Sequence, residues 1–481
     1  MNTQNEKITN YRWVICSMLF FATTVNYMDR QVLSLTWKDF IAPEFHWTNA
    51  DYGNITATFS IIYALAMLFA GKFVDWMDTK KGYLWSIGVW SFGACLHALC
   101  GIGTEWVVGL DSAEALRIAE GADLVAKIAS ISVTFFIIAR FVLAVGEAGN
   151  FPAAIKATAE FFPKKDRAFA TSIFNAGATV GALAAPVSIP FIAASFGLEL
   201  AFLIIGALGF VWMGFWVFIY KKPEAHPRVN ASELSYIRQD NDHEPAGTTE
   251  APAKKMPFMQ CFTYKQTWAF AFGKFMTDGV WWFFLFWTPA YLSSVYGLDS
   301  TQSAPQIFVL YLITLLSIVG GWLPTYFVEK KGMHPYAGRM RSMLIFAFFP
   351  LLALLAQPLG GMTEEFGALA VWFPVVIIGI AGAAHQAWSA NIFSTVGDMF
   401  PRSAIATVTG IGGMAGGVGA FVINMSSGVL FDYATNTQMQ FMGFKGIEAG
   451  YFIIFSICAV SYLIGWVVMK MLVPTYKKIN L

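Results

Sequence analysis

The chain has 481 residues, of which 57% are hydrophobic and only 13% are charged, and its mean hydropathy is +0.56. Soluble domains carry about 25% charged residues, so this composition excludes an ordinary water-soluble fold and indicates a protein that faces lipid. A formal net charge of +1 argues against a nucleic-acid partner, because no net positive field exists to displace counterions from phosphates.

Apolar segments long enough to cross a bilayer follow one another along the chain. About 20 residues of helix cross the hydrocarbon layer, and a spanning backbone must satisfy its own hydrogen bonds, which favours helices. We therefore expect an all-α membrane protein with twelve transmembrane helices in two six-helix bundles. The expected spans are 12–36, 51–76, 82–102, 128–154, 168–195, 198–220, 265–293, 305–328, 339–360, 366–396, 403–431 and 446–472.

A polar, proline-containing segment divides these spans into six plus six. We expect an N-terminal six-helix bundle over 1–220, a cytoplasmic linker over 221–264 and a C-terminal six-helix bundle over 265–481. A second polar stretch, 103–127, forms a mildly amphipathic insert between the third and fourth spans.

Lysine and arginine are distributed unequally between the two sides of the membrane. Loops on the side of the N-terminus contain most of them, including the pairs at 80–81, 164–165 and 330–331. The opposite loops contain only Lys38, Arg117, Lys127 and Lys445. Because basic loops stay inside, we expect a multi-pass protein of the plasma (inner) membrane with both termini in the cytoplasm.

The two halves of the chain repeat each other. GKFVDWMDTKKG (71–82) precedes span three, and GGWLPTYFVEKKG (320–332) precedes span nine. FFPKKDRAFATSIFNAGATVGA (161–182) follows span four, and MFPRSAIATVTGIGGMAGGVGA (399–420) follows span ten. Such a parallel duplication is one way in which transporters are built, with the binding site between the halves near the midplane.

Spans one and four each carry an acid and a base. Asp29 and Arg30 are adjacent in span one, about 100° apart on a helix, so they cannot simply neutralise each other. Arg140 and Glu147 are seven residues apart and share one face of span four. A lone charge at the bilayer centre costs on the order of 2.5–3.5 kcal/mol, so these groups need a wet cavity or a partner. An ion pair with a neighbouring span is the alternative to a substrate site.

Two arginines that point into one cavity suit a substrate carboxylate, because guanidinium binds it bidentately and keeps its proton. The two acids nearby, Asp29 and Glu147, can each hold a proton with one occupancy of the site and release it with another. The sequence thus favours two arginines that bind the substrate carboxylate, beside an acid that carries a proton.

The second half carries polar groups of a different kind. Lys274 and Asp278 lie four residues apart in span seven, where a local ion pair is the better interpretation. Span ten places several polar side chains at mid-membrane depth, which suit either hydroxyl recognition or interhelical hydrogen bonds. The candidates are His385, Gln386 and Asn391, with Tyr63 in span two and Asn175 in span five on the same logic.

The sequence contains no nucleotide-binding P-loop, so ATP is not the expected energy source. The five cysteines, at 16, 95, 100, 261 and 458, are scattered, which predicts neither a disulfide framework nor a metal site. No catalytic triad is arranged as an active site. We expect a protein that is not an enzyme and that uses no cofactor apart from a coupling proton.

Several of these strings resemble known transporters. GKFVDWMDTKKG resembles the loop motif of the major facilitator superfamily. NYMDRQVLS, RFVLAVGEAGNFPAAIKATAEFFPKKDRA and AHQAWSANIFSTVGDMFPR resemble the anion:cation symporter branch, and within it the bacterial hexuronate transporters, which take up galacturonate and glucuronate with protons.

This resemblance implies roles for particular residues. Arg30 and Arg140 would engage the substrate carboxylate, and Asp29 and Glu147 would be the protonation sites. The residues expected against the sugar are Tyr27, Tyr63 and Asn391. Gly71 and Asp75 of the loop motif would help latch span two against span eleven. The second copy of that motif departs from the pattern, with Pro324 and Thr325 near the place of an acid.

The expected function is a proton-coupled symporter that imports an acidic sugar by alternating access. Because two arginines recognise a carboxylate and not a ring, another organic anion such as an aldonate or an aldarate is the alternative. An anion-sensing membrane receptor is a second class, which the linker disfavours because it shows no sign of a folded signalling domain. The expected partners are a small anionic sugar, a proton and the lipid bilayer, with the protein acting as a monomer.

Overall fold

The computed structural model describes residues 7–239 and 256–479, apart from the side chains of 164, 165, 168, 402, 403 and 406. The middle of the expected linker, 240–255, and the side chains of the basic pair at 164–165 therefore lie outside the described residues. The rest is almost wholly helical, which follows from the need of a lipid-exposed backbone to pair its own N–H and C=O groups.

The first half runs from α1 to α10. Its elements are α1 (Arg12–Thr36), the π-helical turn η1 (Trp37–Ile41), α2 (Ala42–Phe45), α3 (Asn49–Met77), α4 (Thr79–Leu96), η2 (His97–Leu99), α5 (Cys100–Val108), α6 (Ala113–Arg117), α7 (Ala122–Glu147), α8 (Asn150–Phe161), α9 (Lys164–Phe196) and α10 (Leu198–Ile219).

Short helices of the linker lead into the second half. The linker elements are η3 (Pro223–Ala225), α11 (Ala231–Arg238) and α12 (Phe258–Cys261). The second half consists of α13 (Lys265–Tyr296), α14 (Ala304–Thr314), η4 (Leu315–Ile318), α15 (Val319–Lys331), α16 (Pro335–Phe348), η5 (Phe349–Leu355), α17 (Ala356–Gly360), α18 (Thr363–Phe366), η6 (Gly367–Leu369), α19 (Trp372–Met399), α20 (Arg402–Thr437), β1 (Gln440–Phe441), β2 (Phe444–Lys445) and α21 (Ile447–Leu472). The two short strands form an antiparallel hairpin before α21.

Ten spans among the described residues are long and apolar enough to cross a membrane. They are formed by α3, α4 with α5, α7 with α8, α9, α10, α14 with α15, α16 with α17, α19, α20 and α21. The long helices α1 and α13 fall outside this set. Both helices contain charged residues within their length, Asp29 and Arg30 in α1 and Lys274 and Asp278 in α13. These charged side chains lower the mean hydropathy of the two helices.

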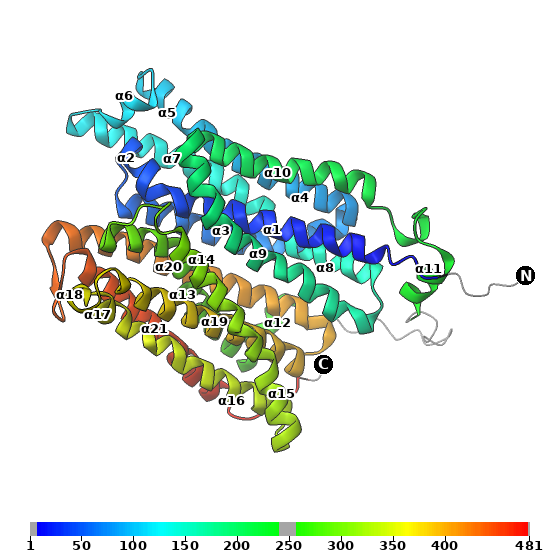
Figure 1. Ribbon diagram of the computed structural model, residues 1–481. Coiled ribbons are helices and arrows are strands. Elements are labelled where there is room, and N and C mark those ends of the chain that lie inside the picture. The colour runs from blue at the N-terminus through cyan, green and yellow to red at the C-terminus, as the bar shows by residue number, and fades with distance from the viewer. Residues whose placement is uncertain (1–6, 240–255, 480–481) are drawn as a thin grey trace, which may run out of the picture.

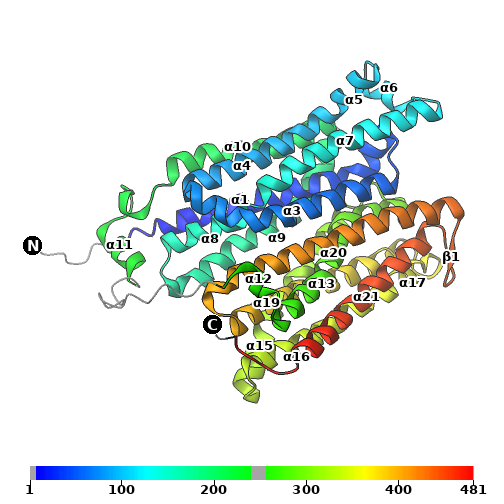
Figure 2. The same cartoon turned by 180° about the vertical axis from the view of Figure 1, so that it is seen from behind.

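The helices form two bundles that lie side by side, one from each half of the chain (Figures 1 and 2). The start of α1, the linker helix α11 and the end of α21 lie at one end of the molecule, here called the terminal end. The opposite end, where α3 begins and α20 finishes, is called the distal end.

Small residues let helices approach closely both within and between the halves. A Cβ atom on Gly177 or Gly181 of α9 would clash with the carbonyl oxygens of Phe20 and Thr24 in α1. Between the halves, α3 packs along α20, where a Cβ on Gly417 would clash with Ala64. Such contacts draw helix backbones together in lipid, where no hydrophobic force does so.

Hydrogen bonds join the two halves at the distal end. Asp432 of α20 accepts bonds from the backbone N–H of Asn49 (2.9 Å) and Ala50 (2.6 Å) at the start of α3. Reciprocally, Asp39 of η1 accepts bonds from Ser300 N (2.6 Å) and Ser293 Oγ (3.1 Å) of the second half. Each half thus supplies a carboxylate that caps free N–H groups of the other.

At the terminal end, the linker helix α11 clasps the start of α1. Glu233 is fully buried and accepts bonds from Tyr11 N (2.9 Å), Arg12 N (3.1 Å) and the Thr9 hydroxyl, and it pairs with Arg12 Nη1 at 3.1 Å. Burial opposes ionisation, but these hydrogen bonds outweigh it and hold the pKa of Glu233 below its usual value. The linker helix therefore belongs structurally to the first half.

Replacing Glu233 by Gln removes this charged cap and should lower stability by about 1–2 kcal/mol at pH 7. Because the pKa of Glu233 is lowered in the folded protein, its contribution is complete above the unfolded pKa of about 4.3 and disappears as the pH falls through the folded value. The difference in thermal unfolding temperature between E233Q and wild type should accordingly shrink towards pH 3–4. The exposed Glu224, paired with Arg238, provides the control E224Q, for which we expect little change.

Replacing Asp432 by Asn should weaken the distal closure and raise the population of a distally open state by roughly five- to tenfold, the equivalent of one charge-assisted hydrogen bond. Spin labels at the exposed positions 111 and 436 would report this as a longer distance by pulsed electron resonance. The control is D51N, because Asp51 caps the same helix end through Thr48 of its own half. An unchanged distance distribution in D432N would contradict the role of this contact.

Candidate functional site

A buried ion pair inside the first half lies at the centre of the site. Arg30 of α1 donates from Nε (3.0 Å) and Nη2 (2.7 Å) to one oxygen of Glu147, at the end of α7. Arg30 is 4% exposed and Glu147 is fully buried. The sequence allowed an ion pair between neighbouring spans as an alternative to a substrate site, and such a pair is formed. The partner of Arg30 is Glu147 of span four and not Asp29, its neighbour in the sequence.

Aromatic rings surround the Arg30 guanidinium. Its carbon lies 4.8 Å from the ring centroid of Tyr63, 5.2 Å from Tyr27 and 5.8 Å from Phe59, all in the first half. The fourth ring, Trp282 at 5.0 Å, belongs to α13 of the second half. Arg30 therefore lies at the junction of the two halves, and each ring adds cation–π attraction in a setting shielded from water.

The second arginine of the site keeps unused donors. Arg140 of α7 is 2% exposed, and its Nε and Nη1 have no hydrogen-bond partner among the described residues. Its guanidinium carbon lies 5.4 Å from the Phe59 ring, so the two arginines flank one aromatic side chain. Asp29 is also buried, and neither of its oxygens has a partner in the described part of the chain. Buried charges without partners are costly, which marks this region as one built for a ligand.

The second half repeats the packing of the first. Gly181 of α9 packs on Thr24 of α1, and Gly419 of α20 packs on Phe275 of α13 in the same way. Aligning these contacts places Trp281 where the first half has Arg30. Aligning Phe162-Pro163 with Phe400-Pro401 places His385 where the first half has Glu147.

The chemistry at these equivalent positions is different. Trp281 stacks on His385 with ring centroids 5.3 Å apart and planes 5° from parallel. His385 Nδ1 lies 2.8 Å from the Tyr462 hydroxyl. An aromatic stack in the second half thus occupies the position of the ion pair in the first, so charge recognition is concentrated in the first half.

The other polar candidates of span ten do not join the arginine site. The Asn391 amide donates to Gly320 O and Ala387 O, both at 2.8 Å, so it bonds its own helix and α15. The structure therefore does not place Asn391 with the arginines, and the expected contact of Asn391 with the sugar stays a prediction. Gln386 is half-buried, and Asn175 is exposed on a face of α9 other than the one that Gly177 and Gly181 pack against α1.

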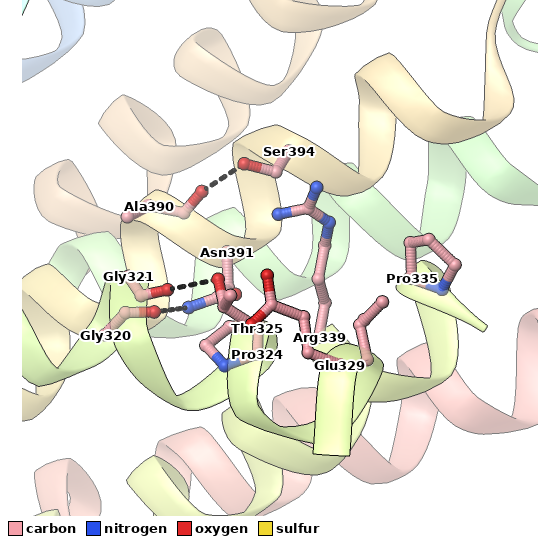
Figure 3. A pocket seen from close by; sticks show the side chains of 11 residues that line it. Gly320, Gly321, Pro324, Thr325, Glu329, Pro335, Arg339, Ala390, Asn391 and Ser394 are labelled. Carbon is pink, nitrogen blue, oxygen red and sulfur yellow. Dashed lines mark hydrogen bonds between the residues drawn. The ribbon is translucent and has the colours of Figure 1, made fainter. Parts of the chain in front are cut away.

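Asn391 lines a separate cavity of about 300 Å³ between α15, α16 and α19 (Figure 3). Arg339 and Glu329 both line it, and Arg339 Nε lies 2.8 Å from Asp398 Oδ2. Because Asp398 and Glu329 together outnumber the single cation Arg339, this cavity has no excess positive charge. It is therefore a poor match for an anionic ligand.

The loop motif forms its ion pair within one half. Asp75 Oδ1 lies 3.1 Å from Lys156 Nζ of α8, and a Cβ on Gly71 would meet open space. In this structure Asp75 thus links spans two and four, and its expected part in latching span two against span eleven stays a prediction. In the second half, Thr325 stands near the equivalent place and makes its hydrogen bond to Gly321 O. Lys274 and Asp278 do form the local ion pair, at 2.7 Å.

Phe59 is the site residue that sequence reasoning missed. Its ring lies 5.8 Å from the guanidinium carbon of Arg30 and 5.4 Å from that of Arg140, and it stacks on Tyr63 with ring centroids 6.0 Å apart. The available signal was spacing, because Phe59 and Tyr63 are four residues apart and share a helix face.

Comparisons with known proteins agree with this architecture. Residues 19–424 match the sequence model of the Major Facilitator Superfamily. The "Hexuronate transporter" of Escherichia coli (strain K12) is 27% identical over 428 residues, 89% of each chain. The "Galacturonate transporter" of Dickeya chrysanthemi is 27% identical over 367 residues, 76% of this chain and 95% of that one. The "Probable galactarate/D-glucarate transporter GarP" of E. coli K12 is 25% identical over 459 residues, 93% of this chain and 94% of that one.

Solved structures support the same fold. A bacterial homologue of the human lysosomal transporter Spinster, in an inward-facing and unoccupied conformation, superposes with a TM-score of 0.68 at 17% identity, covering 97% of this chain and 98% of that one. A D-xylose-proton symporter superposes with a TM-score of 0.65 at 15% identity, covering 95% and 98%. The chain belongs to the Major Facilitator Superfamily and is a multi-pass membrane transporter, not an enzyme.

Proposed function

We propose that this transporter is a proton-coupled symporter that imports hexuronates such as galacturonate and glucuronate by alternating access. The observation that carries the proposal is the pair of buried arginines at the junction of the halves, one held by Glu147 and the other with unused donors. The named functions of the relatives, at 25–27% identity over most of the chain, support a sugar acid as the substrate.

The substrate carboxylate binds between the two arginines in this proposal. Arg140 offers Nε and Nη1, which have no partner in the described part of the chain. Each of these nitrogens shares one edge of the guanidinium with Nη2, and either edge is shaped for a bidentate carboxylate contact. The rings of Tyr27, Tyr63 and Trp282, which already surround Arg30, offer faces for the apolar side of a sugar ring.

Proton coupling follows from competition for Arg30. When Glu147 is ionised, it occupies both Nε and Nη2 of Arg30. A proton on Glu147 removes that attraction and frees the guanidinium for the incoming carboxylate. Proton and anion therefore favour each other's binding, and this reciprocity is the condition for coupled transport. Asp29, buried beside them, serves as a second proton site.

Alternating access uses the closure of the distal end. Asp432 and Asp39 join the halves at the distal end, so in this proposal access to the site would come from the terminal end, which we place in the cytoplasm. Opening to the outside requires those hydrogen bonds to break while the terminal ends approach. Both halves contribute to the site, so one chain is sufficient for function.

An aldarate such as galactarate is the alternative substrate, because several relatives are named probable galactarate/D-glucarate transporters, at 23–27% identity. A dicarboxylate needs a second free cation. Lys274, a buried cation of the second half, is already neutralised by Asp278 at 2.7 Å. The charge distribution therefore favours a substrate with one carboxylate.

Replacing Arg140 by Ala should abolish both net uptake and counterflow of labelled galacturonate in proteoliposomes. The loss of a charge-assisted bidentate contact is worth about 3 kcal/mol, which corresponds to roughly a 100-fold lower affinity. The exposed Arg341 provides the control R341A, which should transport normally. Unimpaired transport by R140A would refute the carboxylate contact.

Replacing Glu147 by Gln should separate exchange from proton coupling. The amide imitates the protonated acid, so counterflow should persist while accumulation driven by a pH gradient stops. The measurement is uptake of labelled galacturonate, glucuronate and galactarate with and without an imposed gradient. If E147Q keeps the pH dependence of the wild type, Glu147 is not the coupling group.

A further inference from the structure

A second set of titratable groups lies in the first half, near the distal end and away from the arginines. Glu44 of α2, Glu199 of α10, His97 of η2 and Gly101 of α5 line a cavity of about 10 Å³, together with four apolar side chains. That volume is enough for one water molecule. None of these four residues belongs to the site described above.

The two carboxylates converge on one point. A Cβ built on Gly101 would lie 3.4 Å from Glu44 Oε1 and 4.0 Å from Glu199 Oε1. Glu44 is 5% exposed, and burial together with the charge of Glu199 raises its pKa to about 7, against the opposing effect of Arg117. The charge of Glu105 in α5 also raises the pKa of Glu44, as the charge of Glu199 does. Glu44 therefore exchanges its proton near neutral pH.

His97 supplies the independent observation at this cavity. It is 3% exposed, and its ring stacks on Phe202 with centroids 4.9 Å apart. Nδ1 lies 2.7 Å from Gly93 O, so this nitrogen carries hydrogen and donates to the carbonyl. Nε2 is left as a proton acceptor without a partner among the described residues. A buried imidazole that faces a water-sized cavity between two acids is suited to proton transfer.

Polar atoms continue inward from His97 towards the arginine site. Arg140 lies within electrostatic reach of both His97 and Asp29, and the Trp90 indole lies beside Asp29. Asn26, Asp29, Trp90, Ser91 and Arg140 all have buried polar atoms with no hydrogen-bond partner in the described residues. Buried groups of this kind are generally satisfied by ordered water in proteins. Such waters would connect His97 to Asp29.

We propose that the Glu44–Glu199–His97 cavity is the port through which the coupling proton enters from the outside, on a route separate from that of the sugar. A proton passes from external water to the carboxylate of Glu44 or Glu199, then to His97 Nε2, and from that nitrogen through bound waters to the carboxylate of Asp29. Only a proton moves at each step, and each donor returns to its starting charge. This inference rests on the proposed proton coupling and names its external site.

Arg140 gives the port a means of control. Arg140 lies within electrostatic reach of His97, so its positive charge opposes the passage of a proton along this route when the substrate site is empty. A substrate carboxylate on Arg140 cancels that charge and lets the proton pass. The port therefore opens when the sugar acid is bound, which limits proton leak through an unoccupied transporter.

The test compares His97→Asn and Glu44→Gln with wild type in proteoliposomes, using labelled galacturonate and a pH-sensitive dye. Both variants should slow uptake driven by a pH gradient, with its accompanying proton flux, by at least about fivefold. Counterflow, which needs no net proton movement, should stay within about twofold of wild type. Wild-type uptake should fall as the external pH rises through about 7, where Glu44 loses its proton, and E44Q should flatten this step.

Two further variants make the result specific. Gly101→Ala should fill the cavity at ordinary contact distance without changing a titratable group, and it should reproduce the loss of gradient-driven uptake even where H97N folds poorly. Glu114→Gln, at an exposed acid of the same distal insert, should behave as wild type. Equal loss of counterflow and uptake in H97N, E44Q and G101A, or no loss in either, overturns the port. If wild-type uptake itself ignores the pH gradient, the proposed coupling fails and the port fails with it.

Discussion

The structure depends on one constraint, the high free-energy cost of an ionised side chain at bilayer depth. Arg30 satisfies it with two hydrogen bonds to Glu147 and a surround of aromatic rings. The helix that carries Arg30 is positioned by backbone contact, because Gly177 and Gly181 bring α9 against α1. Small residues at a helix interface and a charge pair in the core are therefore parts of one arrangement. The small residues fix the distance between the helices, and the charge pair depends on that distance.

The two halves of the chain share this helix packing but carry different side chains at the equivalent positions. Contact through a glycine recurs between α20 and α13, yet Trp281 and His385 stack where Arg30 and Glu147 form an ion pair. The second half keeps a buried ion pair of its own, Lys274–Asp278, but that pair is local to α13 and does not occupy the position equivalent to Arg30–Glu147. In the proposed site, the arginines of the first half would contact the carboxylate and aromatic rings of the second half would cover it.

Sequence patterns predicted the helices far better than the partners of their side chains. The expected span 198–220 coincides to within one residue with α10 (Leu198–Ile219), because apolar length is a strong and local signal. The sequence also indicated that Asp29, Arg30, Arg140 and Glu147 are functional, since charges in lipid are rare. It did not indicate that Arg30 pairs with Glu147, 117 residues away, because pairing depends on how helices rotate and pack. The same reason explains why Asn391 bonds Gly320 O of α15 and why Asp75 pairs with Lys156.

Trp282 gives the ion pair a direct connection to the motion of the halves. It is the ring from the second half that contacts the Arg30 guanidinium, at 5.0 Å. When Glu147 is ionised, it holds the guanidinium inside the first half, and Trp282 meets a cation whose charge is largely balanced. Once Glu147 is protonated, as proposed, the same ring meets an unbalanced cation or the carboxylate bound to it. A ligand moves a conformational equilibrium only through contacts that differ between the two states. The Arg30–Trp282 contact crosses the boundary between the halves, so under the proposed alternating access a change of charge within one half would alter the free energy of bringing both halves together.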